Sequence, residues 1–170
     1  MTALEFGVAS EDDSAACAAL RNAVADRLIR EFGTGHWAAA GSVDGVRRSL
    51  RNSRIIVGRM GGELVAMLRL TTRKPWAIDI ARFTPARRPL YLVDMAVFPE
   101  LQRRGIGRRL LEHAESVARA WPADAIRLDA YDTDAGAGPF YEKCGWTERG
   151  RVVYRKTPLI YYERLLNVES

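Results

Sequence analysis

The sequence predicts an α/β fold in which a mixed, mostly antiparallel sheet is flanked by helices. Two observations predict it: β-rich runs alternate with longer amphipathic runs, and two neighbouring β-rich runs are joined by a Gly-Gly turn. The chain has 170 residues, of which 48% are hydrophobic, and it shows no repeat, low-complexity segment or linker. We therefore expect one compact domain over residues 1–170 with a sizeable core.

The first elements follow from patterns near the N-terminus. Residues 4–9 alternate and predict a strand, and Ser10–Asp13 resemble a capping box. Apolar residues then recur at helical spacing over residues 16–29, which predicts an amphipathic helix. Residues 32–41 hold three glycines and predict a loop, and the serine that opens residues 42–50 is placed to cap a second helix.

A hairpin is the clearest signal in the middle of the chain. Residues 54–59 and 63–70 are β-rich, and Met60-Gly61-Gly62 joins them in a tight turn. Residues 72–89 hold three prolines and many basic side chains, so they predict an irregular connection. Within that connection, residues 76–83 could extend a strand.

The remaining elements are marked by proline and glycine. Pro99 ends a buried-looking strand, Pro122 stops a long amphipathic helix, and Gly145 ends a short helix. These predicted elements are a strand at 91–98, a helix at 106–121, a strand at 125–131, a helix within 134–144, and strands near 147–155 and 159–166. The predicted order is thus β-α-α-β-β-β-α-β-α-β-β.

Composition argues against two classes of partner. The net charge is +5 and 26 basic residues face 21 acidic ones, but the two signs are mixed along most helices and no nucleic-acid signature is present. No run of about 18 apolar residues could span a membrane, and the N-terminus lacks a signal-peptide pattern. We expect no nucleic-acid partner, no membrane span and a cytoplasmic location.

Cysteine and histidine are too sparse to predict a metal site. Cys17 and Cys144 lie far apart, and His36 and His113 share no ligand spacing with each other or with either cysteine. We expect no metal, a reducing compartment and two thiols without a chemical role.

The most informative segment is Gln102-Arg103-Arg104-Gly105-Ile106-Gly107. It predicts a Gly-containing turn into a helix, whose first N–H groups and partial positive charge suit a phosphate. Arg103, Arg104, Arg108 and Arg109 add guanidinium groups that match phosphate oxygens. Leu110 excludes a dinucleotide-binding fingerprint, and the arginines after Gly107 exclude a Walker A loop. The segment is therefore predicted to hold the pyrophosphate of a large anionic cofactor.

The segment is similar to a known cofactor motif. The pattern Gln/Arg-x-x-Gly-x-Gly/Ala after Met95-Ala96-Val97-Phe98-Pro99 resembles the acetyl-CoA-binding motif of the GNAT superfamily of acyl-CoA-dependent N-acyltransferases. Residues 138–146 are similar to the family's Leu/Phe-Tyr-x-x-x-Gly-Phe segment, with Trp146 in place of Phe. The spacing of the two motifs and the order of elements over nearly the whole chain also resemble the family. The resemblance implies a GNAT-like fold and acetyl transfer from acetyl-CoA to a primary amine.

The resemblance also implies how acetyl-CoA is held. In the family, the strand before the turn splays from its neighbour, and its backbone pairs with the pantetheine arm. By position this role falls to Met95, Ala96 and Val97, and the pyrophosphate faces Gln102, Arg103, Arg104, Gly105, Ile106, Gly107 and Arg108. Asp134 stands where many relatives have an asparagine that contacts the cofactor arm; a helix N-cap is the alternative role for it.

Tyr141 is the predicted general acid. A phenol with a pKa near 10 can protonate a thiolate whose conjugate acid has a pKa near 8.5, uphill by only about 2 kcal/mol. The alternative is a tyrosine that packs against the cofactor for shape.

Asp94 and Asp129 are the candidates for the general base, one on each of the two strands that are expected to splay. Asp94 lies in an otherwise apolar strand, where a carboxylate is costly unless it is used or paired. Asp129 aligns with a carboxylate that serves as base in some family members. Structural pairing with an arginine, or a water chain that carries the proton, is the alternative for both.

The acceptor is the part that the sequence defines least. Residues 30–42, residues 72–89 and the last two strands would build its pocket, and His36 and Trp37 lie in the first of these segments. No adaptor or extra domain is visible, which favours a small-molecule amine over a protein. The fold allows a homodimer through its C-terminal strands. A catalytically silent acyl-CoA-binding regulatory module is the alternative function.

Overall fold

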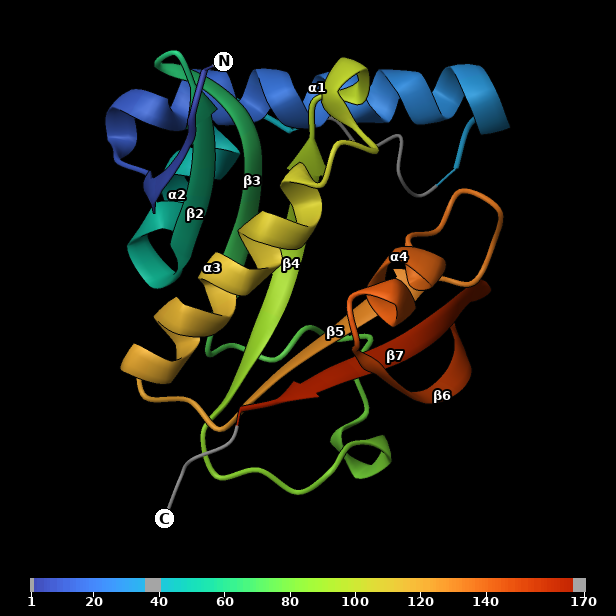
Figure 1. The fold of residues 1–170 in the computed structure, drawn as a ribbon. Coiled ribbons are helices and arrows are strands. Elements are labelled where there is room, and N and C mark those ends of the chain that lie inside the picture. The colour runs from blue at the N-terminus through green and yellow to red at the C-terminus, as the bar shows by residue number, and fades with distance from the viewer. Residues whose placement is uncertain (1, 36–40, 167–170) are drawn as a thin grey trace. The chain divides into compact units, whose positions relative to one another are not determined.

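The computed structural model describes residues 2–35 and 41–166. Within them, seven strands form one mixed sheet in the order β1-β2-β3-β4-β5-β7-β6, with helices beside it (Figure 1). The strands are β1 (Leu4–Val8), β2 (Arg54–Met60), β3 (Glu63–Thr71), β4 (Pro89–Val97), β5 (Ala125–Tyr131), β6 (Thr147–Tyr154) and β7 (Thr157–Leu165). The helices are α1 (Ser14–Phe32), α2 (Val43–Asn52), α3 (Ile106–Ala120) and α4 (Gly138–Lys143).

The predicted fold class and element order are confirmed. β4 and β5 are parallel, whereas β1–β2, β2–β3, β5–β7 and β6–β7 are antiparallel, so the sheet is mixed and mostly antiparallel. The Gly-Gly turn joins β2 to β3 as predicted, with φ of +59° at Gly61 and +82° at Gly62. Ser42 caps α2, because its Oγ accepts a hydrogen bond from the backbone N of Gly45 at 2.9 Å.

The chain divides into two compact units. The first is formed by Met1–Thr71 and Val93–Ala114, and the second by Thr72–Leu92 and Glu115–Ser170. Each unit takes two separate stretches of chain, and the unit boundary runs through β4 and through α3. The expectation of a single domain over residues 1–170 stays a prediction.

In the first unit, α1 and α2 cover one face of the strands β2 and β3 (Figure 1). Strand alternation puts Ile55 and Val57 of β2 on this face, where they join a buried cluster with Cys17, Leu20 and Val46. Side chains at the alternate positions of these strands point to the opposite face. There the ring of Phe6 from β1 stacks on His113 of α3, with centroids 5.0 Å apart.

In the second unit, residues 72–88 cover one face of the strands. Ile78 and Phe83 from this segment pack with Tyr91 of β4 and Tyr161 of β7 in a buried cluster. The idea that residues 76–83 extend a strand is wrong, because this part of the chain has no regular structure beyond a 3-10 turn at Ile80–Arg82. Backbone groups of this segment form hydrogen bonds with side chains of the sheet, whereas a strand would pair with the backbone of its neighbour.

Candidate active site

The predicted phosphate-binding turn lies in the first unit, between a 3-10 turn at Pro99–Leu101 and the start of α3. Arg103 and Gly105 both have left-handed backbone conformations, with φ of +64° and +81°. The first hydrogen bond of the helix runs from the backbone N of Arg109 to the carbonyl of Gly105, at 3.1 Å. N–H groups that come before such a bond are those that a helix offers to an anion.

The side chains of this turn are suited to a phosphate-bearing group. Arg103, Arg104, Arg108 and Arg109 are all exposed, and no carboxylate lies among residues 102–109. Buried Ile106 anchors the turn. The donor set therefore consists of guanidinium and backbone N–H groups, which is the chemistry that a pyrophosphate requires.

Gln102 has a role that the motif did not predict. Its Nε2 donates a hydrogen bond to the carbonyl of Val97 at 3.0 Å. This bond links the phosphate-binding turn to the end of β4, the strand that is predicted to pair with the pantetheine arm. In that strand Ala96 is buried, whereas Met95 and Val97 are half-buried.

Asp94 of β4 lies at a backbone position that few residues adopt. Its φ is +58°, a left-handed conformation that costs an L-residue about 1–2 kcal/mol and that Asp tolerates better than most. Its carboxylate faces two arginines: Oδ2 accepts from Nε of Arg69 at 3.0 Å, and Oδ1 lies 3.3 Å from a terminal nitrogen of Arg21. Asp94 is thus paired with cations from β3 and α1.

Tyr141 lies in the second unit, on α4, with only 6% of its surface exposed. Pro139 near the start of the helix fixes the first turn, and Tyr141 follows two positions later. Its ring centroid lies 5.7 Å from that of Trp146 and 5.8 Å from that of Tyr162. Burial raises the pKa of the Tyr141 phenol far above its usual range, and the charges of Cys144 and Asp129 add to this.

Asp129 of β5 is the second acidic candidate, and it lies in the same unit as Tyr141. It is directly paired with Tyr161 in the β5–β7 ladder, so the two side chains project from the same face of the sheet. Burial raises the pKa of its carboxyl. Within residues 2–35 and 41–166, no hydrogen bond or ion pair engages this carboxylate, in contrast to Asp94.

Asp134 is not a helix N-cap, so that alternative is wrong. The cap position of α4 belongs to Ala137, and Asp134 lies in the turn before it. The turn is tight because Gly136 donates a backbone hydrogen bond to the carbonyl of Thr133 at 2.9 Å. A Cβ at Gly136 would lie 1.8 Å from the carbonyl oxygen of Tyr131, which explains the glycine. Contact of Asp134 with a cofactor stays a prediction, and the predicted role of His36 and Trp37 lies outside the described residues.

Three residues hold residues 72–88 in place, and none of them was predicted as a catalytic or cofactor-binding residue. Tyr161 Oη accepts from the backbone N of Asp79 at 3.1 Å, and Glu163 Oε2 accepts from the backbone N of Thr84 at 3.1 Å. Arg127 donates to the carbonyl of Thr84 at 2.9 Å. A buried charge in an otherwise apolar strand was the available signal for Arg127 and Glu163, which are 4% and 3% exposed.

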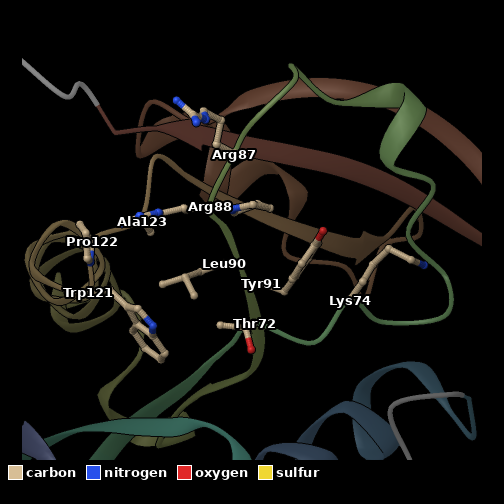
Figure 2. A pocket seen from close by; sticks show the side chains of 10 residues that line it. Thr72, Lys74, Arg87, Arg88, Leu90, Tyr91, Trp121, Pro122 and Ala123 are labelled. Atoms are coloured by element: carbon tan, nitrogen blue, oxygen red, sulfur yellow. The ribbon is translucent and has the colours of Figure 1, made fainter. Parts of the chain in front are cut away.

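A depression of about 410 Å³ lies on the second unit (Figure 2). Apolar, aromatic and basic side chains line it, among them Leu90, Tyr91, Trp121, Arg87 and Arg88. The turn that carries the two arginines is fixed by Asp124, which accepts from their backbone N atoms at 2.8 and 3.0 Å. None of the predicted catalytic or cofactor-binding residues lines this depression.

Across residues 2–35 and 41–166, no three His, Cys, Asp or Glu side chains are grouped as a metal ion would need. Nor does any helix in those ranges combine the length and the hydropathy required to cross a bilayer.

Comparison with known proteins gives a family and a set of similar structures. The model of the Acetyltransferase (GNAT) family matches residues 19–146. No curated protein sequence matches the chain significantly.

Among the similar structures is the ribosomal-protein-S18-alanine N-acetyltransferase from Escherichia coli, with a TM-score of 0.72 and 16% identity, covering 99% of this chain and 97% of that chain. Another is yncA from Salmonella typhimurium with its cofactor acetyl-CoA, with a TM-score of 0.68 and 17% identity over 99% and 96% of the two chains. A third is the PaiA N-acetyltransferase from Thermoplasma acidophilum in complex with coenzyme A, with a TM-score of 0.73 and 13% identity over 95% and 99%. At these identities the likeness establishes the fold.

Proposed function

Because this chain belongs to the GNAT acetyltransferase family and is an acyltransferase, we propose that it moves the acetyl group of acetyl-CoA to a primary amine by direct attack in a ternary complex. The acceptor in this proposal is a small molecule. Acetyl-CoA, when bound, supplies an acetyl group that is activated as a thioester. The chain's own residues must hold the cofactor, accept a proton from the amine and donate one to the leaving thiolate.

The turn at Gln102–Arg108 is the observation that carries the proposal. Its exposed arginines, its left-handed Gly105 and its place at the start of α3 support pyrophosphate binding. The backbone of Met95–Val97 is the proposed partner of the pantetheine arm. Two similar structures contain acetyl-CoA or coenzyme A, which supports the same cofactor here.

Tyr141 is the proposed general acid. Because burial raises its pKa, the phenol stays protonated at every pH that an assay would use. The same burial makes it a weaker acid than in water, so it gives up its proton readily only to a thiolate that has also lost its hydration. Such a positioned acid contributes about 10²–10⁴ to the rate.

Asp129 is the proposed general base. A raised pKa increases the proton affinity of its carboxylate, as a base that takes a proton from an ammonium group requires. Its surroundings also favour it over Asp94, since an ammonium group would have to displace an arginine to reach the Asp94 carboxylate.

Cofactor binding is the first test. Titration of the wild-type chain with acetyl-CoA by calorimetry, at two salt concentrations, should give micromolar affinity that weakens as salt screens the arginines. Gly107→Trp should abolish binding because the indole would occupy the space for phosphate, and Gly107→Ala should preserve it, since the family motif accepts Gly or Ala there. A wild-type chain that binds neither acetyl-CoA nor CoA would overturn the proposal.

Turnover is the second test. Release of CoA should depend on both substrates in the sequential pattern of a ternary complex; parallel double-reciprocal lines would contradict direct attack. The acceptor panel should include small primary amines together with a peptide that has an N-terminal alanine, because the E. coli neighbour is named as a ribosomal-protein acetyltransferase. If the peptide is acetylated and none of the small amines is, the proposed small-molecule acceptor is wrong and a protein acceptor takes its place.

A further inference from the structure

Asp94 differs from every other non-glycine residue with positive φ in the described chain. Arg103 lies in the phosphate-binding turn, and Arg155 and Lys156 form the turn between β6 and β7. Asp94 alone among these lies inside a strand, with φ of +58°. A left-handed residue within a strand breaks the regular ladder and changes the direction of the N–H and C=O groups that follow.

The side chain of Asp94 is fixed by two other elements of the first unit. Arg69 of β3 donates from Nε to Oδ2 at 3.0 Å, and Arg21 of α1 lies 3.3 Å from Oδ1. Arg69 is itself placed by Ser53, whose Oγ accepts from a terminal nitrogen at 3.4 Å. Between 69% and 78% of each of the three charged side chains is shielded from solvent. The unusual backbone conformation and the double ion pair therefore coincide at one residue.

The chain directly after Asp94 is also fixed. Ala96 is 6% exposed and packs in the cluster that contains Cys17 and Leu20 of α1. The backbone N of Phe98 donates to the carbonyl of Val65 on β3 at 2.9 Å. With both of these points held, the conformation of Asp94 decides how the backbone of Met95–Val97 is directed.

We propose that Asp94 is a positioning residue: its ion pairs with Arg21 and Arg69 hold a left-handed kink in β4 that directs the Met95–Val97 backbone toward the pantetheine arm of acetyl-CoA. This inference rests on the proposed function. It assigns Asp94 to cofactor affinity and not to proton transfer, because both of its oxygens already face guanidinium groups.

Three substitutions at Asp94 distinguish the contribution of its left-handed backbone conformation from the contribution of its carboxylate charge. Asp94→Asn keeps the shape and a side chain that tolerates positive φ, Asp94→Gly keeps only the backbone freedom, and Asp94→Ala keeps neither. We expect the KM for acetyl-CoA to rise about threefold in Asp94→Asn, more in Asp94→Gly and at least tenfold in Asp94→Ala. The pH profile of kcat should stay that of the wild type in all three.

The arginines provide an independent measurement. Arg69→Ala should raise the KM for acetyl-CoA as Asp94→Asn does, and the double variant should add little, since both changes remove the same interaction. Asp13→Ala is the matched control: Asp13 pairs with Arg59 at 2.8 Å in the same unit, and neither residue belongs to β4. It should leave the KM unchanged, and Asp94→Asn should keep a cooperative thermal transition.

The outcomes are distinct. A hundredfold loss of kcat in Asp94→Asn, with the KM unchanged and one limb of the pH profile lost, would mean that Asp94 is the base and would overturn the inference. Wild-type KM values in Asp94→Ala would overturn it as well, while leaving the proposed function intact. A wild-type chain that binds no acetyl-CoA would overturn the proposed function and this inference together.

Discussion

Asp129 of β5 and Tyr161 of β7 are directly opposite each other in an antiparallel ladder, so a half-buried carboxyl and a buried phenol share one face of the second unit. Burial is the main cause of the raised pKa of each group. Asp129 and Tyr161 therefore hold their protons more tightly than they would in water, which has consequences for both stability and rate.

Asp129→Asn should stabilise the protein at neutral pH and inactivate it. Since folding raises the pKa of Asp129, its contribution to stability is fully present below the unfolded value of about 3.8 and is lost as the pH rises through the folded value. The variant should melt at a higher temperature than the wild type at pH 8, and the difference should shrink toward pH 4. At pH 7, kcat should fall by about 10²–10⁴.

Calorimetry across this pH range and CoA-release assays measure the two effects separately. A difference in melting temperature that does not depend on pH would contradict the burial of an ionisable Asp129. Unchanged kcat would remove Asp129 as the base.

Tyr141→Phe should lower kcat by about 10²–10⁴ with little change in the KM for acetyl-CoA, because only the proton donor is lost. The ring contacts with Trp146 and Tyr162 remain, so the fold should be preserved. Tyr162→Phe is the matched control in the same aromatic cluster. It removes a phenol whose pKa is raised to about 12 and which donates to Glu142 at 3.1 Å. Equal loss of kcat in both variants would point to packing of the cluster in place of acid catalysis.

Gly105→Val should weaken both the fold and cofactor binding. Gly105 has φ of +81°, where a β-branched residue is strained, and a Cβ there meets no atom within 4 Å. The cost of about 1–2 kcal/mol is therefore a backbone effect and not a clash. Gly105→Asn should recover much of it, because Asn tolerates left-handed conformations. Denaturant unfolding and acetyl-CoA titration measure the two effects, and equal stability of the two variants would contradict the backbone explanation.

Glu163→Ala should release residues 72–88 and destabilise the protein by about 2–4 kcal/mol in urea unfolding. The buried carboxylate accepts from both the backbone N and the hydroxyl of Thr84, and it pairs with Nε of Arg149 at 3.2 Å. Arg47→Ala is the control, since its exposed pairing with Asp44 at 3.7 Å should be worth no more than about 0.5 kcal/mol. Similar losses in both variants would show that residues 72–88 do not depend on Glu163.

Local signals were sufficient for most of the fold. Gly61 and Gly62 specify the β2–β3 turn, Ser42 specifies the start of α2, and Pro122 the end of α3, because each acts within a few residues of itself. Residues 72–88 could not be predicted in the same way. Their conformation depends on Tyr161 and Glu163, which are about 80 residues away in the sequence.

In the candidate site, too, features set by nearby residues could be predicted from the sequence, and features set by distant residues could not. The arginines and glycines at residues 102–107 were recognisable because the turn and the helix start are local features. The left-handed conformation of Asp94 was not, since the run Leu92–Val97 reads as an unbroken strand and contains no glycine. The two partners of Asp94 come from positions 21 and 69, and no spacing rule connects them.

The division of the chain into units bears on its synthesis. The first unit includes Val93–Ala114, so it stays incomplete until the ribosome has added 43 residues beyond Thr71, and for part of that time its core lacks Ala96. At about 5–20 residues per second, this interval lasts roughly 2–9 s. Early in this interval, the cluster that contains Cys17 and Leu20 still lacks part of the surface that covers it in the finished chain. A nascent chain halted between residues 72 and 92 is therefore expected to offer chaperones and proteases apolar surface of this cluster that the finished chain covers.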